Sequence, residues 1–253
     1  MRHLAFAFTL LATSAAAQDG SAISGIDLVP SRGAEIGAVF EAWLSPQQEG
    51  GEEQDTPGII PQTFRSTTPS VDRNDRTSRG HGTLSFSRDL SRAYAHVRIE
   101  NVNPDEINMF HIHCGRPGQL GPIIVDLGME LDLSEEFADG EILVEITNED
   151  IVAVIERAQG LVSAFTAGCP IVPTIPTDRV VTVAGMAHIA FVRELYFNLH
   201  TTGQTYFGDI RGQLYPTEHG NEKTKHPLDS GQDTDEILND SYWLLYRTVE
   251  ISL

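Results

Sequence analysis

The sequence predicts a mostly β protein, an antiparallel Greek-key-like β-sandwich or barrel with one or two short helices. Two observations lead to this fold class. From Val39 onward, short segments alternate between apolar and polar residues, which is the period of a half-buried strand. Gly, Pro, Asn and Asp interrupt these segments after a few residues, and short strands at such spacing are typical of antiparallel sandwiches and barrels.

Eight segments have the composition of strands. The clearest is 93–99, in which the odd positions are apolar and the even positions are polar or amphipathic. Each segment is bounded by residues that favour turns. The predicted strands are 38–44, 82–86, 92–99, 107–113, 122–127, 141–146, 195–201 and 206–214.

Two stretches have helical signals. Residues 147–150, Thr-Asn-Glu-Asp, form a capping sequence for a helix over 151–158, and Gly160 is placed to end it. The apolar residues of this helix fall on one face, so we expect it to cover a sheet or to close a barrel end. Further on, 180–183 has the pattern of a strand and 184–193 that of a helix.

The chain divides into four predicted parts. They are a signal peptide over 1–17, an N-terminal lead-in over 18–36, a β domain over 37–215 with a mobile insertion at 46–79, and an acidic tail over 216–253 with an apolar terminal segment. The insertion is rich in Gln, Glu, Gly, Pro, Ser, Thr and Arg and lacks apolar periodicity. The apolar end of the tail is expected either to dock as a strand or short helix or to bind a partner.

The N-terminus has the marks of a signal peptide. A short basic region is followed by an apolar stretch over 4–11 and by small residues up to Ala17. This stretch is too short to span a bilayer, and no later segment is long and apolar enough, so we expect no transmembrane segment. The mature protein is therefore expected to be exported, to the periplasm or the extracellular space. The alternatives are an uncleaved anchor and a chance apolar run.

The charge of the chain excludes some partners. The formal net charge is −19, with 17 Lys and Arg against 36 Asp and Glu. Nucleic acid is excluded because its phosphates require a basic face, and the same argument applies to an anionic membrane surface. A protein or a small ligand remains as the partner, of unknown identity.

Two motifs almost ninety residues apart in the sequence carry a family resemblance. The first contains His111-Ile-His113 and then Gly118, Gly121 and Pro122, and the second contains Asn198-Leu-His200-Thr201 followed by residues 208–214, Gly-Asp-Ile-Arg-Gly-Gln-Leu. Together they resemble the CHRD (chordin-type) domain over about 39–214. The resemblance implies an extracellular module that occurs alone in bacterial exported proteins and as repeats in the chordin family, whose proteins bind secreted growth factors. A lone exported copy is expected to be a binding or structural module.

Histidines in these motifs form a candidate metal site. His111 and His113 are two apart on a predicted strand, so their side chains leave the same face. The CHRD pattern would place His200 near them, and three imidazoles suit copper or zinc. The arrangement also resembles, more weakly, the copper site of Cu/Zn superoxide dismutase, but 123–125 stands where that family has a bridging histidine. Hydrogen-bonded structural histidines and an acid/base role are the alternatives. We expect no cofactor, and copper or zinc is the alternative.

Two further residue sets are candidates for structural roles. Two cysteines in an exported protein predict the disulfide Cys114–Cys169, with two free thiols or a thiolate metal ligand as alternatives. Arg211 is expected to pair with Asp209 or Asp126 and to lock the last strand, or else to bind an anion.

Sequence signatures of enzymes are missing elsewhere in the chain. It has no Gly-x-Ser-x-Gly elbow, no phosphate-binding glycine loop, no His-Glu-x-x-His helix and no Cys-x-x-Cys. No catalytic residue is therefore assigned, and a module without catalytic machinery is favoured over an enzyme. The competing hypothesis is a copper- or zinc-binding sandwich, redox-active or not.

Overall fold

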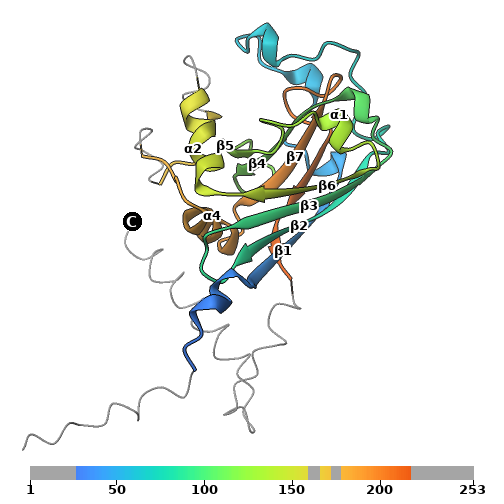
Figure 1. Cartoon of the computed structure of the whole chain (residues 1–253). Coiled ribbons are helices and arrows are strands. Elements are labelled where there is room, and N and C mark those ends of the chain that lie inside the picture. Colours follow the sequence, from blue (N-terminus) through green and yellow to red (C-terminus); the bar gives the residue numbers. More distant parts are fainter. Residues whose placement is uncertain (1–26, 159–165, 172–177, 218–253) are drawn as a thin grey trace, which may run out of the picture. The chain divides into compact units, whose positions relative to one another are not determined.

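The computed structural model describes residues 27–158, 166–171 and 178–217 (Figure 1). By its internal contacts the chain forms two units, 1–32 and 33–253, and both sheets belong to the second unit. The predicted signal peptide, residues 18–26 of the lead-in and nearly all of the acidic tail lie outside the described residues. Among the described residues, no helix combines the length and apolarity needed to cross a membrane.

The described strands form two antiparallel sheets. One has five strands in the order β6-β3-β2-β1-β9, and the other has four in the order β5-β4-β7-β8. The strands are β1 Ile36–Leu44, β2 Arg79–Ser87, β3 Ala93–Glu100, β4 Ile107–Cys114, β5 Ile123–Asp126, β6 Glu141–Ile146, β7 Leu195–Thr201, β8 Ile210–Gln213 and β9 Tyr215–Pro216. Two separate sheets make this a sandwich and not a closed barrel, which confirms the predicted fold class.

All eight predicted strands are present, with one clear difference in extent. The segment 206–214 becomes a strand only at Ile210, because Gly208 has a φ of +111° and interrupts the extended backbone. A side chain at that position would also collide with the amide of Asn198. The short strand β9, which pairs with β1, was not predicted.

The described helices are short, and side chains cap the N-termini of α1, α2 and α4. The predicted helix after Thr147 is α2, Asn148–Arg157, and the Asp150 carboxylate accepts hydrogen bonds from the Thr147 backbone N–H at 2.7 Å and its hydroxyl at 2.8 Å. Helix α4 is Val183–Phe191. The remaining helices are α1, Leu133–Glu136, and the 3-10 helices Pro30–Ala34, Pro46–Gln48, Glu53–Asp55, Gln62–Phe64 and Pro104–Glu106.

The strand predicted over 180–183 is wrong. Thr182 is the N-cap of α4, since its hydroxyl accepts from the Gly185 N–H at 3.0 Å, and Val183 is already the first helical residue. Capping by a β-branched residue thus overrides the strand propensity of the valines before it.

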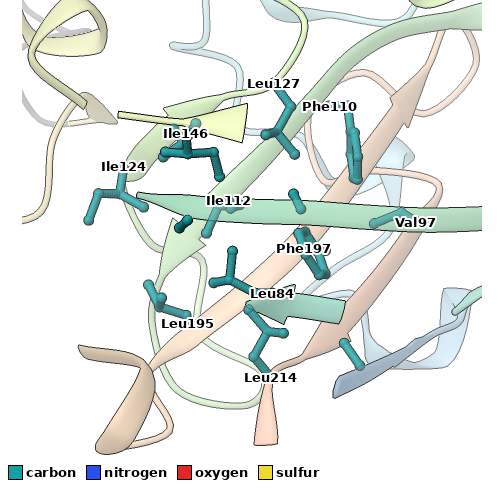
Figure 2. Packing of buried hydrophobic residues seen from close by; sticks show 14 of the residues in the cluster. Leu84, Val97, Phe110, Ile112, Ile124, Leu127, Ile146, Leu195, Phe197 and Leu214 are labelled. Atoms are coloured by element: carbon teal, nitrogen blue, oxygen red, sulfur yellow. The ribbon is translucent and has the colours of Figure 1, made fainter. Parts of the chain in front are cut away.

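The core lies between the two sheets (Figure 2). Leu84 and Val97 of the five-stranded sheet face Phe110, Ile112 and Phe197 of the four-stranded sheet, and all five side chains are fully buried. Strand alternation therefore points the neighbours of Phe110 and Ile112 to the opposite face of the four-stranded sheet.

That opposite face is polar and also buried. His111 of β4 lies opposite Asn198 of β7, which lies opposite Arg211 of β8. Next to this row, His113 lies opposite Tyr196. A buried polar face requires a cover, and chain segments outside the sheets supply it.

The main cover is the segment predicted to be a mobile insertion, 46–79. The segment forms three 3-10 helices and buries polar side chains against the sheet, and its mobility stays a prediction. The Glu53 carboxylate accepts from the backbone N–H groups of Tyr206 (3.0 Å) and Phe207 (3.3 Å), and Arg76 donates to the Asp209 carbonyl at 2.8 Å. Its last residue, Arg79, already belongs to β2.

Candidate metal centre

The structure brings His111, His113 and His200 together. One potential ligand atom from each ring lies within 4.8 Å of the other two. The ring centroid of His111 is 5.3 Å from that of His113 and 5.2 Å from that of His200. Strand alternation places the first two on one face of β4, and the antiparallel pairing of β4 with β7 brings in the third.

Two of the rings are oriented by backbone carbonyls. Nδ1 of His113 donates to the Gly121 carbonyl at 2.8 Å, and Nδ1 of His200 donates to the Thr205 carbonyl at 3.0 Å. Because a carbonyl can only accept, these bonds place the ring hydrogen on Nδ1 and leave a lone pair on Nε2. Both Nε2 atoms are buried and have no hydrogen-bond partner.

In His111 the unpartnered nitrogen is Nδ1 and not Nε2. Nε2 of His111 faces the Asp126 carboxylate, with 3.8 Å between Nε2 and Oδ1. Its Nδ1 is buried and has no hydrogen-bond partner. Each histidine thus has one nitrogen without a partner, and in His113 and His200 the other nitrogen is hydrogen-bonded to a carbonyl.

Burial keeps the three rings neutral. Their exposed fractions are 4% for His111, 5% for His113 and 4% for His200. Burial and the charge of His200 lower the pKa of His113 to about 3, and burial lowers the pKa of His200 to about 4. The pKa of His111 also falls well below its ordinary value, through burial first and the charges of the other two rings second. At neutral pH all three can act as lone-pair donors.

Arg211 does not form the predicted pair with Asp209 or Asp126. Its guanidinium donates to the carbonyls of Gln119 at 2.7 Å and Arg116 at 2.8 Å, and it lies 3.4 Å from the ring centroid of Tyr196. These bonds connect β8 to the turn between β4 and β5. With 1% of its surface exposed, Arg211 has no solvent-facing position for an anion.

The two aspartates have other neighbours. Asp209 pairs with Arg76 of the cover, with 3.5 Å between Oδ1 and Nη1, and Asp126 faces His111. Arg76 was not predicted as a site residue, because its segment has no periodicity that would place it. Two other buried residues of the cover, Glu49 and Glu53, were missed for the same reason.

Tyr196 connects the turn to the histidines. The His113 ring stacks on the Tyr196 ring with 5.0 Å between centroids and an interplanar angle of 7°. The Tyr196 hydroxyl accepts from the Gly121 N–H at 3.0 Å, and the Gly121 carbonyl accepts from His113. Arg211 and Tyr196 therefore hold the turn that orients His113.

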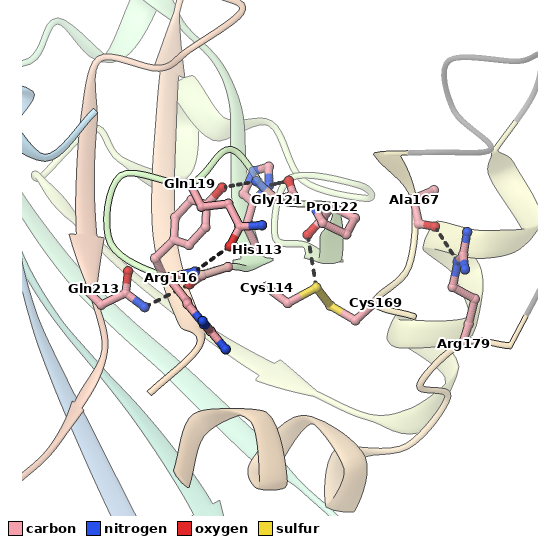
Figure 3. The surroundings of a disulfide bond; sticks show 12 residues. His113, Cys114, Arg116, Gln119, Gly121, Pro122, Ala167, Cys169, Arg179 and Gln213 are labelled. Carbon is pink, nitrogen blue, oxygen red and sulfur yellow. Dashed lines mark hydrogen bonds between the residues drawn. A yellow bond between two sulfur atoms is a disulfide. The ribbon is translucent and has the colours of Figure 1, made fainter. Parts of the chain in front are cut away.

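The predicted disulfide is confirmed. Cys114, directly after His113, is bonded to Cys169 with 6.1 Å between their Cα atoms (Figure 3). The bond fixes the end of β4 beside Gly121 and Pro122. In this oxidised state neither sulfur is a thiolate, so neither is a metal ligand.

Comparison with known proteins gives one family. A family model described as the CHRD domain matches residues 62–214, which is more than half of the 253 residues. Among curated proteins and solved structures, no match to the chain was found. The matched region contains His111, His113 and His200 together with both cysteines.

Proposed function

The chain belongs to the CHRD-domain family, and from that premise we propose that it is a binding module whose ligand is a single copper or zinc ion. His111 would bind the ion through Nδ1, and His113 and His200 would bind it through Nε2. Bound zinc would supply a redox-inert link between β4 and β7, whereas copper would supply a one-electron couple.

The observation that carries the proposal is the set of three unpartnered ring nitrogens. A buried polar atom without a partner costs about 1–3 kcal/mol. Each of the three rings has one such nitrogen, and the rings are close enough that one nitrogen from each lies within 4.8 Å of the other two, so a single cation between the rings would satisfy the group. Histidines with a purely structural role should have partners for both ring nitrogens where these are buried.

The neighbours of the rings support the same proposal. In metal sites a ligating histidine almost always donates its other N–H to a carbonyl or a carboxylate, which fixes the tautomer. The Gly121 and Thr205 carbonyls occupy these positions for His113 and His200, and the Asp126 carboxylate lies 3.8 Å from Nε2 of His111. The ligand set also needs no deprotonation at neutral pH, since burial already keeps the rings neutral.

A mononuclear site fits better than a two-metal site of the dismutase kind. Residues 123–125, where that pattern has a bridging histidine, form most of β5, and Ile124 and Val125 are buried in the core. Among the described residues, the three histidines are the group whose geometry suits a metal ion. The proposal therefore involves no superoxide chemistry.

We further propose that the module works outside the cytoplasm, after removal of residues 1–17. The signal-like N-terminal sequence supports this location, and so does the disulfide, since such bonds persist in oxidising compartments. Expression of the full chain followed by mass measurement of the exported product tests it. Recovery of the intact chain, uncleaved and inside the cell, would contradict this location.

Elemental analysis tests the metal proposal. The exported protein, purified without chelators, should contain about one copper or zinc per chain, and His200→Ala should lose it. His96→Ala is the matched control, because His96 is an exposed histidine on β3 that faces away from the core. Circular dichroism verifies that each variant is folded. A folded wild-type protein that retains neither metal after exposure to both would overturn the proposal.

A further inference from the structure

Met109 lies on the same face of the four-stranded sheet as the three histidines. Its neighbour Phe110 is fully buried in the core, so Met109 and His111 both point to the opposite face. In the strand pairing, Met109 lies directly opposite His200. Side chains at directly opposed positions have Cβ atoms about 4.5–5.5 Å apart, which is within reach of a flexible thioether.

Three imidazoles leave a copper or zinc ion one ligand short of a tetrahedral set. Among the described histidines, cysteines, aspartates and glutamates, no fourth residue joins the group. Asp126 faces Nε2 of His111, whereas the ion would bind Nδ1 on the other side of the ring. Cys114 is held in the disulfide.

Asn198 and Tyr196 share the face with the histidines, but their polar groups lie against other neighbours; the Asn198 amide oxygen is buried without a hydrogen-bond partner. The Asn198 amide nitrogen donates to the Phe207 carbonyl at 2.8 Å, and its oxygen lies against Gly208, toward β8. The Tyr196 hydroxyl accepts from Gly121. Met109 belongs to the neighbouring strand β4, where it lies directly opposite His200.

The charge around the group favours an ion of low charge. The proposed nitrogen ligands are neutral, and the Arg211 guanidinium lies 3.4 Å from the ring centroid of Tyr196, on which the His113 ring stacks. The desolvation cost of an ion rises with the square of its charge, so a buried divalent ion costs roughly four times as much as a monovalent one. Of the ions that imidazole binds well, copper(I) is monovalent, and it also prefers soft sulfur ligands.

We propose that the thioether of Met109 is the fourth ligand and that it makes the site selective for copper(I) over zinc. This inference rests on the proposed metal-binding function and specifies its ligand. Met109 is half-buried while the three histidines are buried. Met109 is therefore more accessible to solvent than the three histidines are.

Competition titrations test the inference. The metal-free protein is titrated with copper(I) against bicinchoninate and with zinc against a chromophoric chelator. Met109→Leu, which nearly conserves volume, should weaken copper(I) binding at least about tenfold and leave zinc binding within about twofold. Met129→Leu is the control, because Met129 lies in the connection between β5 and α1.

X-ray absorption at the copper edge gives a second measurement. The copper(I) protein should show a sulfur neighbour that is absent in Met109→Leu. If wild type binds copper(I) with nitrogen neighbours alone, if Met109→Leu keeps the wild-type affinity, or if zinc binds more tightly, then the inference is wrong while the metal site stands. If wild type binds neither ion, or if His200→Ala binds as wild type does, the metal site itself is wrong.

Discussion

Neutral histidine rings in a buried site make stability depend on pH. His113 has a pKa of about 3 and His200 a pKa of about 4, against an ordinary value of 6.5. Above pH 6.5 these rings are neutral in both the folded and the unfolded chain. Below it, the unfolded chain binds protons that the folded chain excludes, so acidification favours unfolding until the pH reaches the folded-state pKa values.

We predict that the metal-free protein loses stability between pH 6.5 and about pH 4. Each buried histidine contributes up to about 1.4 kcal/mol per pH unit in that window. Burial raises the pKa of Glu49 and Asp126, and these two groups therefore make the folded state more stable as the pH falls. Urea unfolding of wild type and His200→Gln isolates the histidine contribution. Equal slopes of unfolding free energy against pH in the two proteins would contradict the prediction.

Asp126 should act on a bound metal through His111. Its carboxylate lies 3.8 Å from Nε2 of His111, so its charge favours the tautomer that carries the hydrogen on Nε2 and leaves Nδ1 free for the ion. We predict that Asp126→Asn lowers the affinity for copper or zinc by about tenfold, the lower end for the loss of such a partner. Chelator competition measures it, with the exposed Glu100→Gln as control. An unchanged affinity would show that the 3.8 Å approach has no role in binding.

The sequence predicts part of this site and misses the rest for a physical reason. Alternation along one strand is enough to place His111 and His113 on one face. The position of His200 beside them depends on the pairing of β4 with β7. That pairing was expected only from the resemblance to the CHRD family, because alternation along one strand does not specify its neighbour. The carbonyls of Gly121 and Thr205 lie in turns, and no local sequence signal specifies which way a turn carbonyl points.

Charged side chains hold the segment 46–79 over the polar face of the four-stranded sheet. This explains why its sequence has no pattern of regular structure. Glu53 accepts from the N–H groups of Tyr206 and Phe207 and from the Ser66 hydroxyl at 2.6 Å. Thr205 directly precedes Tyr206 in the chain, and its carbonyl orients His200. Strands and helices show themselves by apolar periodicity, whereas a segment fixed by hydrogen bonds of this kind has none.

We predict that Glu53→Gln lowers the unfolding free energy by about 1–3 kcal/mol, because the amide presents one acceptor and one donor to groups that all donate. Urea denaturation measures the change, and the exposed Glu135→Gln is the control. Trypsin should also cleave after Arg73 and Arg76 faster in the variant than in wild type. The same midpoint and the same cleavage rate in both proteins would refute the role of Glu53.

At the scale of the whole molecule, the disulfide ties the end of β4 to a segment 55 residues later in the chain. Closing a loop of this size limits the unfolded chain. We predict that replacing both cysteines, Cys114→Ser with Cys169→Ser, lowers the unfolding free energy by about 2–4 kcal/mol. Thermal or urea unfolding measures it against wild type. Alkylation of the non-reduced wild type should modify no thiol, and two modified cysteines would contradict the bond.

The fold class was predictable because each sheet has one buried apolar face. Such a face produces an alternation of apolar and polar residues along each strand, which is visible in the sequence. The assignment of strands to sheets was not predictable in this way. β9 contains only Tyr215 and Pro216, too few residues for any period, and its place beside β1 depends on the chain crossing from one sheet to the other after β8.

Strand β1 determines how this module can be moved between proteins. It pairs with β2 on one side and β9 on the other and contributes Phe40 and Leu44 to the core, yet it precedes the family match, which begins at residue 62. A fragment cut at 62–214 would leave the edge of β2 unpaired and invite edge-to-edge association. The fragment to use for grafting or gene fusion is therefore 33–217, which keeps β1 paired with β9, and not 62–214, the extent of the family match.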